Sequence, residues 1–187
     1  MTEIASATNL NLFAVLLGGR AAGCRVELHD VAFAVGQSLE DTHEQLLGQW
    51  FGQPQGLHVD AYAVVDQVEG YRVRLERQPP DQPEQRLYFI NIGGYRPNEF
   101  AEQHAYALLA AANKAKAKAR AKRTLLPGHD SVHKDDLYEV DDVLEIRTAA
   151  AWHVHLVADP SATAPRVVNG YFPLPSGTIK AWLKTRS

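Results

Sequence analysis

Residues 12–20 read LFAVLLGGR, and residues 87–95 read LYFINIGGY. Both stretches are short apolar runs that end at a pair of glycines, a pattern typical of a buried strand that stops at a turn. Their offset (87 − 12 = 75) holds over a longer region, because residues 12–68 align with residues 87–143 without a gap. The sequence therefore predicts that one structural unit occurs twice, and this repeat decides the fold.

The middle of each copy predicts a second strand followed by a helix. Ser38 and Asn113 occupy the same repeat position, and both are good N-cap residues because a side-chain oxygen can accept a hydrogen bond from a free backbone N–H. The segment KAKAKARAK alternates strictly, as a strand would, but its residue types favour a helix. The aligned segment of the first copy is amphipathic at helical spacing, so we predict a helix in both copies.

Two further strands close each copy, and each pair is expected to form a hairpin. The hairpin strands are residues 62–68 with 71–77, and residues 140–146 with 152–157. We therefore predict an α+β fold of two tandem pseudo-symmetric β-β-α-β-β repeats that pack together, with the helices on the sheet face. The expected divisions are repeat unit 1 at 12–77, a Pro-rich linker at 78–86, repeat unit 2 at 87–157 and a C-terminal extension at 158–187.

Composition excludes few classes of function. The chain has 187 residues and a formal net charge of 19 − 22 = −3, so its overall charge indicates no particular partner. Cys24 is the single cysteine, which excludes an internal disulfide and fits a reducing compartment. The first residues lack a basic segment, and residues 12–17 are too short a run for a membrane span, so we expect a cytoplasmic protein without a membrane partner.

The repeat separates duplicated polar residues from isolated ones. Glu-x-His recurs ten residues beyond each Gly-Gly pair, and His-x-Asp recurs later in each copy. In an extended segment, this spacing puts both side chains on one face. The pairs suit a general base, a metal ligand or a structural hydrogen bond, and all three readings stay open. The candidate polar site comprises Glu27, His29, His58, Asp60, Glu102, His104, His133 and Asp135.

Other polar features carry less weight. His153 and His155 align with Arg72 and Arg74, so we expect them to face solvent. Residues 114–123 carry six positive charges, but their counterpart in the first copy is acidic. Two helices of opposite charge that complement each other within the molecule explain this pattern better than nucleic acid does. We assign no catalytic residue, no metal ligand and no cofactor, since phosphate-binding, metal-binding and nucleophile motifs are absent from the sequence.

A family resemblance follows from these strings. LFAVLLGGRAAGCRVELHDVAFAVG, followed by HVDAY and GYRVRL, resembles the domain of unknown function 1543 family. LYFINIGGYRPNEFAEQHAYALLAA, followed by KDDLYEVDDVLEI, is similar to the same pattern. The resemblance covers about residues 11–175 and indicates the two-copy form of the family. It implies no activity, cofactor or catalytic residue.

The leading hypothesis is a non-catalytic small-molecule or protein binding module with its site at the junction of the two repeats. One alternative is a metal-assisted or His/carboxylate hydrolase that uses the duplicated polar residues. Another is nucleic-acid binding through the basic helix at 114–123. The sequence leaves the ligand and the oligomeric state open.

Overall fold

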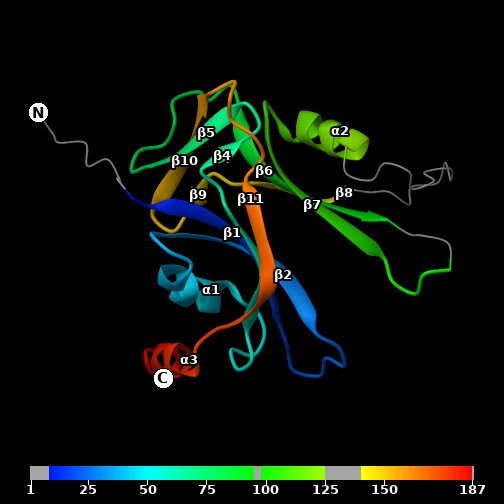
Figure 1. Cartoon of the computed structure of the whole chain (residues 1–187), viewed down its shortest axis with the longest axis vertical. Coiled ribbons are helices and arrows are strands. Elements are labelled where there is room, and N and C mark those ends of the chain that lie inside the picture. Colours follow the sequence, from blue (N-terminus) through cyan, green and yellow to red (C-terminus); the bar gives the residue numbers. More distant parts are fainter. Residues whose placement is uncertain (1–8, 95–97, 125–139, 187) are drawn as a thin grey trace, which may run out of the picture.

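The computed structural model describes residues 9–94, 98–124 and 140–186. Within this part of the chain, the strands form three sheets and are accompanied by three short helices, so the α+β class is confirmed. Figure 1 shows the sheets at the centre, with the helices on the outside.

Sheet A is built by the first repeat and the C-terminal extension. Its strand order is β11-β3-β1-β2, and all neighbouring pairs are antiparallel. The strands are β1 (Asn11–Gly19), β2 (Leu28–Gly36), β3 (His58–Val64) and β11 (Arg166–Pro173). The extension therefore contributes an edge strand to the sheet of the first repeat.

Sheet C is the counterpart of sheet A in the second repeat. It comprises β6 (Arg86–Gly94), β7 (Gln103–Ala111) and β8 (Val140–Glu145), in the order β7-β6-β8. The apolar runs that open the two copies, β1 and β6, are central strands that each pair with two neighbours. Alternate residues of each strand belong to different buried clusters, which explains why both faces of these strands are apolar.

Sheet B joins the two repeats. Its order is β4-β5-β10-β9, with β4 (Gln67–Val68), β5 (Tyr71–Glu76), β9 (Thr148–Ala149) and β10 (Trp152–Ala158). The first expected hairpin is confirmed only at its turn, where β4 pairs with β5 over two residues. In the second, β10 pairs with β9 rather than with residues 140–146, which contain β8, a partner of β6. The remaining expected pairing is also wrong, because β3 pairs with β1 and β11, and β5 pairs along its length with β10 of the other repeat. Local sequence could not show this, because these pairings are non-local.

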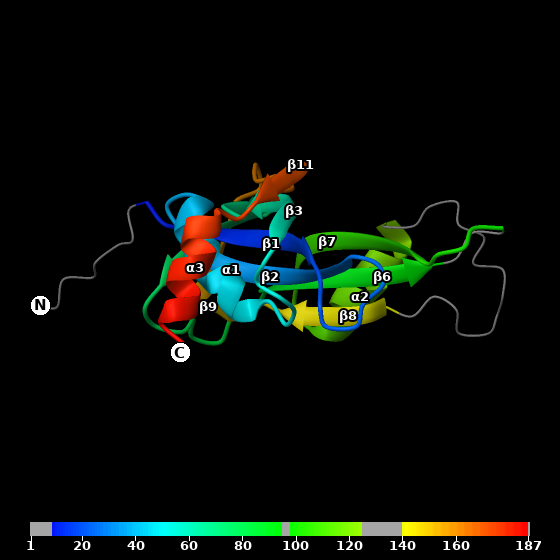
Figure 2. The same cartoon turned by 90° about the horizontal axis from the view of Figure 1, so that it is seen from below.

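The elements stack in four layers. One face of sheet A packs against sheet C around Leu12, Ala14 and Phe89. The other face of sheet A is covered by α1 (His43–Gln49) and α3 (Ser176–Lys184), and the far face of sheet C is covered by α2 (Lys114–Thr124). Figures 1 and 2 both place α1 and α2 on well-separated parts of the molecule, so the interpretation that the two helices of opposite charge complement each other is wrong.

The helix starts follow the expected capping chemistry. Asn113 Oδ1 accepts a hydrogen bond of 2.9 Å from the backbone N–H of Lys116, and α2 is a helix rather than a strand. Ser38 and Asp41 exchange two bonds, because the Ser38 N–H donates to Asp41 Oδ2 and the Asp41 N–H donates to Ser38 Oγ. A short 3-10 turn, Glu40–Thr42, then leads into α1. Among the described helices, none has the length and apolar character needed to cross a bilayer.

Candidate functional site

A row of three residues crosses sheet A where β1 ends. Gly18 pairs with His29 of β2 on one side and with His58 of β3 on the other. Cross-strand partners point their side chains to the same face, so both imidazoles lie above the glycine. A Cβ at Gly18 would stand 2.5 Å from His58 Nε2 and 2.5 Å from Asp60 Oδ2. These groups therefore meet in the space that a side chain at position 18 would occupy.

Asp60 reaches into the same space. It lies two residues from His58 in β3, so the two side chains share a face. The register between β1 and β3 shifts between Leu16 and Leu17, which pair with Ala61 and Val59 and leave Asp60 as the extra residue of a β-bulge. His58 and Asp60 therefore both join the Gly18 row, and the register beyond them is shifted by one residue.

Four side chains form a ring in which imidazoles and carboxylates alternate, here called the His/carboxylate ring. His29 Nε2 lies 3.1 Å from Asp60 Oδ2 and 3.8 Å from Glu27 Oε2. His58 Nε2 lies 3.3 Å from Glu27 Oε1 and 3.4 Å from Asp60 Oδ1. Each imidazole nitrogen thus bridges two carboxylates, which brings together all four candidate residues predicted in the first copy.

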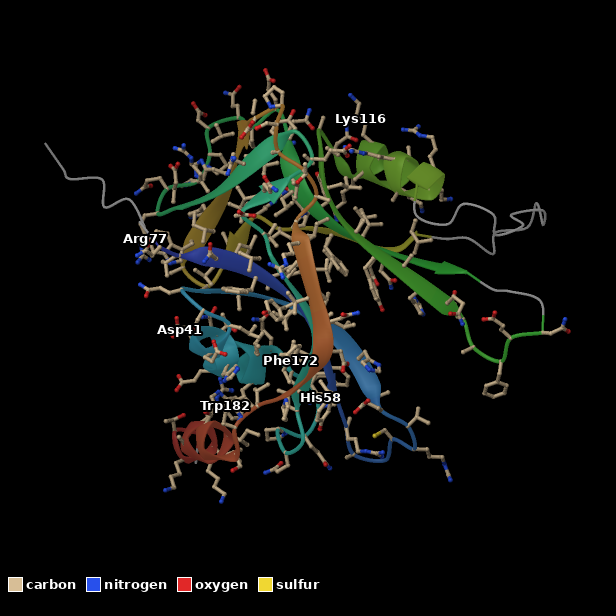
Figure 3. The ribbon with its side chains drawn as sticks, in the orientation of Figure 1. Asp41, His58, Arg77, Lys116, Phe172 and Trp182 are labelled. Carbon is tan, nitrogen blue, oxygen red and sulfur yellow. The ribbon has the colours of Figure 1, made fainter. Side chains whose placement is uncertain are left out.

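His58 is the fixed member of the ring. It is 3% exposed, and its Nδ1 lies 2.9 Å from the Gly56 carbonyl oxygen. The carbonyl can only accept, so Nδ1 carries the hydrogen and Nε2 is left for the carboxylates. The Tyr171 ring covers the imidazole at a centroid distance of 4.6 Å. Figure 3 shows His58 close to Phe172, which lies on the edge strand β11, where the next residue, Pro173, pairs with His58.

Asp60 holds the unsatisfied atom of the ring. Its Oδ2 is buried and makes no hydrogen bond, although His29 Nε2 is only 3.1 Å away. The contact therefore has the distance of a hydrogen bond without its geometry. No group of three or more His, Cys, Asp or Glu side chains in the described part of the chain is arranged to hold a metal ion.

The second copy has a related but different arrangement. Gly93 pairs with His104, as Gly18 pairs with His29. His104 Nδ1 lies 3.1 Å from Asn91 Oδ1, and its Nε2 lies 3.8 Å from Glu102. Leu16 stands in the first copy where Asn91 stands in the second, so the amide contact belongs to the second copy alone. His133 and Asp135 lie outside the described residues.

The strand registers correct the ungapped alignment of the two copies. Leu17 pairs with Val59 directly after the first bulge, and Ile92 pairs with Val140 directly after an equivalent irregularity. The offsets are 92 − 17 = 75 and 140 − 59 = 81, so the second copy has six more residues between the start of α2 and β8. By this count Asp60 corresponds to Asp141 rather than to Asp135. Insertions of this kind are tolerated in connecting segments and leave no signal in an ungapped comparison.

A groove of about 420 Å³, here called the inter-repeat groove, lies between sheets A and C. Both repeats contribute apolar side chains to it, as do Pro165 and Val167 near the start of β11. Phe89 and Tyr106 stack at a centroid distance of 5.7 Å. Burial raises the pKa of Tyr106, and the charge of Asp30 adds to the increase. Other lining residues are Ala14, Leu16, Val31, Ala61 and Leu108.

The groove and the His/carboxylate ring are continuous along sheet A. Leu16 precedes Gly18 by two residues, Val31 follows His29 by two, and Ala61 adjoins Asp60. A two-residue step is about 7 Å along a strand and returns to the same face. The ring therefore stands at one end of the apolar groove, on the same face of the sheet.

The sequence missed several residues of the site and misjudged one histidine. Gly56, Tyr106 and Tyr171 gave no signal, because a carbonyl acceptor and stacking partners become recognisable only when the chain is folded. His155, expected to face solvent, has a side chain only 17% exposed, and its Nε2 lies 2.8 Å from the Gln78 carbonyl oxygen. The linker packs over β10 at this point, and the repeat comparison with Arg74 could not show that.

The basic helix is partly engaged within the molecule. Arg120 pairs with Glu69 and also donates to the Ala110 carbonyl oxygen. Ala117 and Ala121 are fully buried against sheet C.

Comparison with known proteins supports the duplicated organisation. A family model described as Domain of Unknown Function (DUF1543) matches twice, at residues 24–75 and 99–149. The chain belongs to this family. The two matches confirm the predicted two-copy form. The crystal structure of protein Il1583 from Idiomarina loihiensis is similar, with a TM-score of 0.67 and 32% identity over 90% of this chain and 99% of that one. No curated protein matches this chain.

Proposed function

We propose that this DUF1543 protein is a non-catalytic binding module whose site is the inter-repeat groove. The observation that carries the proposal is a groove of about 420 Å³ that both repeats build and that ends at a polar cluster. Small-molecule sites have this character: a concave, mostly apolar space of several hundred Å³ with a few convergent polar groups. The ligand class that fits is a small molecule with an apolar body and one polar end.

A second cavity of about 430 Å³ is a weaker candidate for the same role. It lies between the Pro-rich linker and the strands β6 and β10. Its charged lining residues already pair with each other, because Glu145 contacts both Arg86 and Arg147 at 3.4 and 2.8 Å. In the inter-repeat groove, by contrast, the adjoining ring contains a buried carboxylate oxygen that has no hydrogen bond.

Filling the groove tests the proposal. Ala61→Trp adds a large side chain to the lining, and Ala151→Trp makes the same change at an exposed turn between β9 and β10. A panel of small apolar molecules with different polar ends is screened by thermal shift, and each hit is titrated by calorimetry. Hits should bind wild type and Ala151→Trp equally and fail to bind Ala61→Trp. Equal binding to all three folded proteins, or no hit in the panel, would reject the groove as the site.

The His/carboxylate ring favours acid–base catalysis, as in a hydrolase, as a second candidate function. A carboxylate next to an imidazole orients it for proton transfer, and three contacts here are 3.1 to 3.4 Å long. The candidate bases are His29, which is 45% exposed, and the buried His58. Turnover of chromogenic esters and amides should then disappear in His29→Gln and persist in His43→Gln, whose histidine lies on α1 behind sheet A. Turnover that survives His29→Gln and His58→Gln would exclude the ring as its source.

A further inference from the structure

We infer that the inter-repeat groove selects a ligand with a cationic head group, specifically a primary amine carried on an apolar or aromatic body. This inference rests on the groove being the binding site, and it adds the charge of the ligand. It follows from the sign and the hydrogen-bonding character of the groups at the polar end of the groove.

The polar end is rich in acceptors. Glu27 and Asp60 contribute four carboxylate oxygens, and His58 points Nε2 at both carboxylates because its Nδ1 is bound to the Gly56 carbonyl. When the imidazoles are neutral, the cluster has more acceptors than hydrogens to share among them. The buried Asp60 Oδ2 without a hydrogen bond is the direct sign of this deficit. A ligand that brings N–H donors and positive charge would relieve it.

Further carboxylates lie near the groove. The charge of Asp30 raises the pKa of Tyr106, which lines the groove. Glu102 lies beside His104, whose ring stacks on the Tyr106 ring at a centroid distance of 6.4 Å. Among the described lining residues, none is Lys or Arg. Carboxylates around a low-dielectric groove concentrate a negative potential, which attracts cations and repels carboxylate or phosphate ligands.

Exposure shows which members the ligand would contact first. Glu27 and His29 are each 45% exposed, whereas His58 is buried behind them. An ammonium group can donate to Glu27 at this surface. The apolar body would then extend along Phe89, Leu16 and Val31. The buried His58 and the partly buried Asp60 hold the acceptors in place and need not contact the ligand.

Three probes that share one body test this charge preference. Phenethylamine carries a cation, 2-phenylethanol a neutral hydroxyl and 3-phenylpropanoate an anion. Calorimetric titration at pH 8 and low salt should show the amine binding about tenfold or more tightly than the alcohol, since a hydrogen bond to a charged group is worth about one to two decades in affinity. The anion should bind most weakly, and added salt should reduce the preference for the amine.

Two matched variants locate the preference. Glu27→Gln should reduce the amine's advantage to within about threefold while leaving binding of the alcohol unchanged, since half-exposed Glu27 loses its charge but not its shape. Glu44→Gln makes the same change on α1, on the far side of sheet A, and should leave all three affinities as in wild type. If 3-phenylpropanoate binds as tightly as the amine, or Glu27→Gln keeps the preference, the charge assignment is wrong although the groove still binds. If none of the probes binds, both the groove function and this inference fail together.

Discussion

Gly18→Ala tests whether the missing side chain in the middle of the ring is a structural requirement. The new Cβ would stand 2.5 Å from both His58 Nε2 and Asp60 Oδ2, which is closer than carbon approaches such atoms. Neither group can retreat easily. His58 is buried with Nδ1 held by the Gly56 carbonyl, and Asp60 Oδ2 is a buried atom only 3.1 Å from His29 Nε2. Inserting one methyl group into a packed site of this kind costs about 1–3 kcal/mol.

The free energy of unfolding from urea titration measures this cost directly. At this chain length, about 1–3 kcal/mol also lowers Tm by roughly 2–4 °C for each kcal/mol. Gly177→Ala in α3 is the matched control, because a Cβ there meets nothing within 4 Å and a helical alanine stabilises by about 0.5–1 kcal/mol over glycine. The two substitutions, identical in chemistry, should therefore shift stability in opposite directions.

A double-mutant cycle identifies the cause of the loss. Asp60→Ala removes one of the two atoms that the new Cβ would meet, so Gly18→Ala should cost less in that background than in wild type. A change of less than about 0.5 kcal/mol in the free energy of unfolding is the ordinary range of a surface substitution. If Gly18→Ala stays within it, the space above Gly18 is not as tight as the contacts indicate.

Three further outcomes follow from individual contacts. Burial lowers the pKa of His43 below its ordinary 6.5, and Glu40 opposes the shift. The unfolded chain therefore binds more protons than the folded one, so the free energy of unfolding should fall as pH drops through 6.5. His43→Gln should flatten that part of the stability profile, as measured by urea titration at a series of pH values. Hydrogen bonds from Ser161 and then from Arg72 lower the pKa of Asp159 from 3.8 to about 2. The ionised carboxylate therefore stabilises the fold above pH 3.8, and this stabilisation is lost between about pH 4 and 2. In an acid titration followed by circular dichroism, Asp159→Asn should lack this loss. His155→Ala leaves the Gln78 carbonyl without its donor and should destabilise by about 1 kcal/mol, whereas a thermal unfolding curve identical to wild type would show that the linker does not depend on this contact.

The sequence succeeded where short-range chemistry decides structure. Asn113 caps α2 because its side chain is three residues from the N–H that it binds, and that relation is visible in the sequence. The pair Glu27 and His29 was chosen as a candidate because two-residue spacing in a strand fixes a common face. Both inferences depend only on neighbours within a few residues.

The site as a whole required the folded chain. The Glu27–His29 and His58–Asp60 pairs lie about thirty residues apart, and sequence spacing alone could not show that they share one row across Gly18. Nor could it show the bulge at Asp60, because bulges leave no mark in the alternation of residue types. The partner of β5 was likewise misjudged, since pairing with β10 joins residues about eighty positions apart.

The amino-acid sequence by itself determined that the chain is a duplication, that its class is α+β, and which polar residues of the first copy belong to the candidate site. These properties follow from periodicity and capping, which involve only neighbouring residues, and from repetition, which is found by comparing one part of the sequence with another. Only the tertiary structure decided that β11 completes sheet A, that six additional residues precede β8, and that the ring adjoins an apolar groove between the repeats. The physical reason is that sheet pairing and face-to-face packing join distant segments through backbone hydrogen bonds and buried area, which no short stretch of sequence encodes.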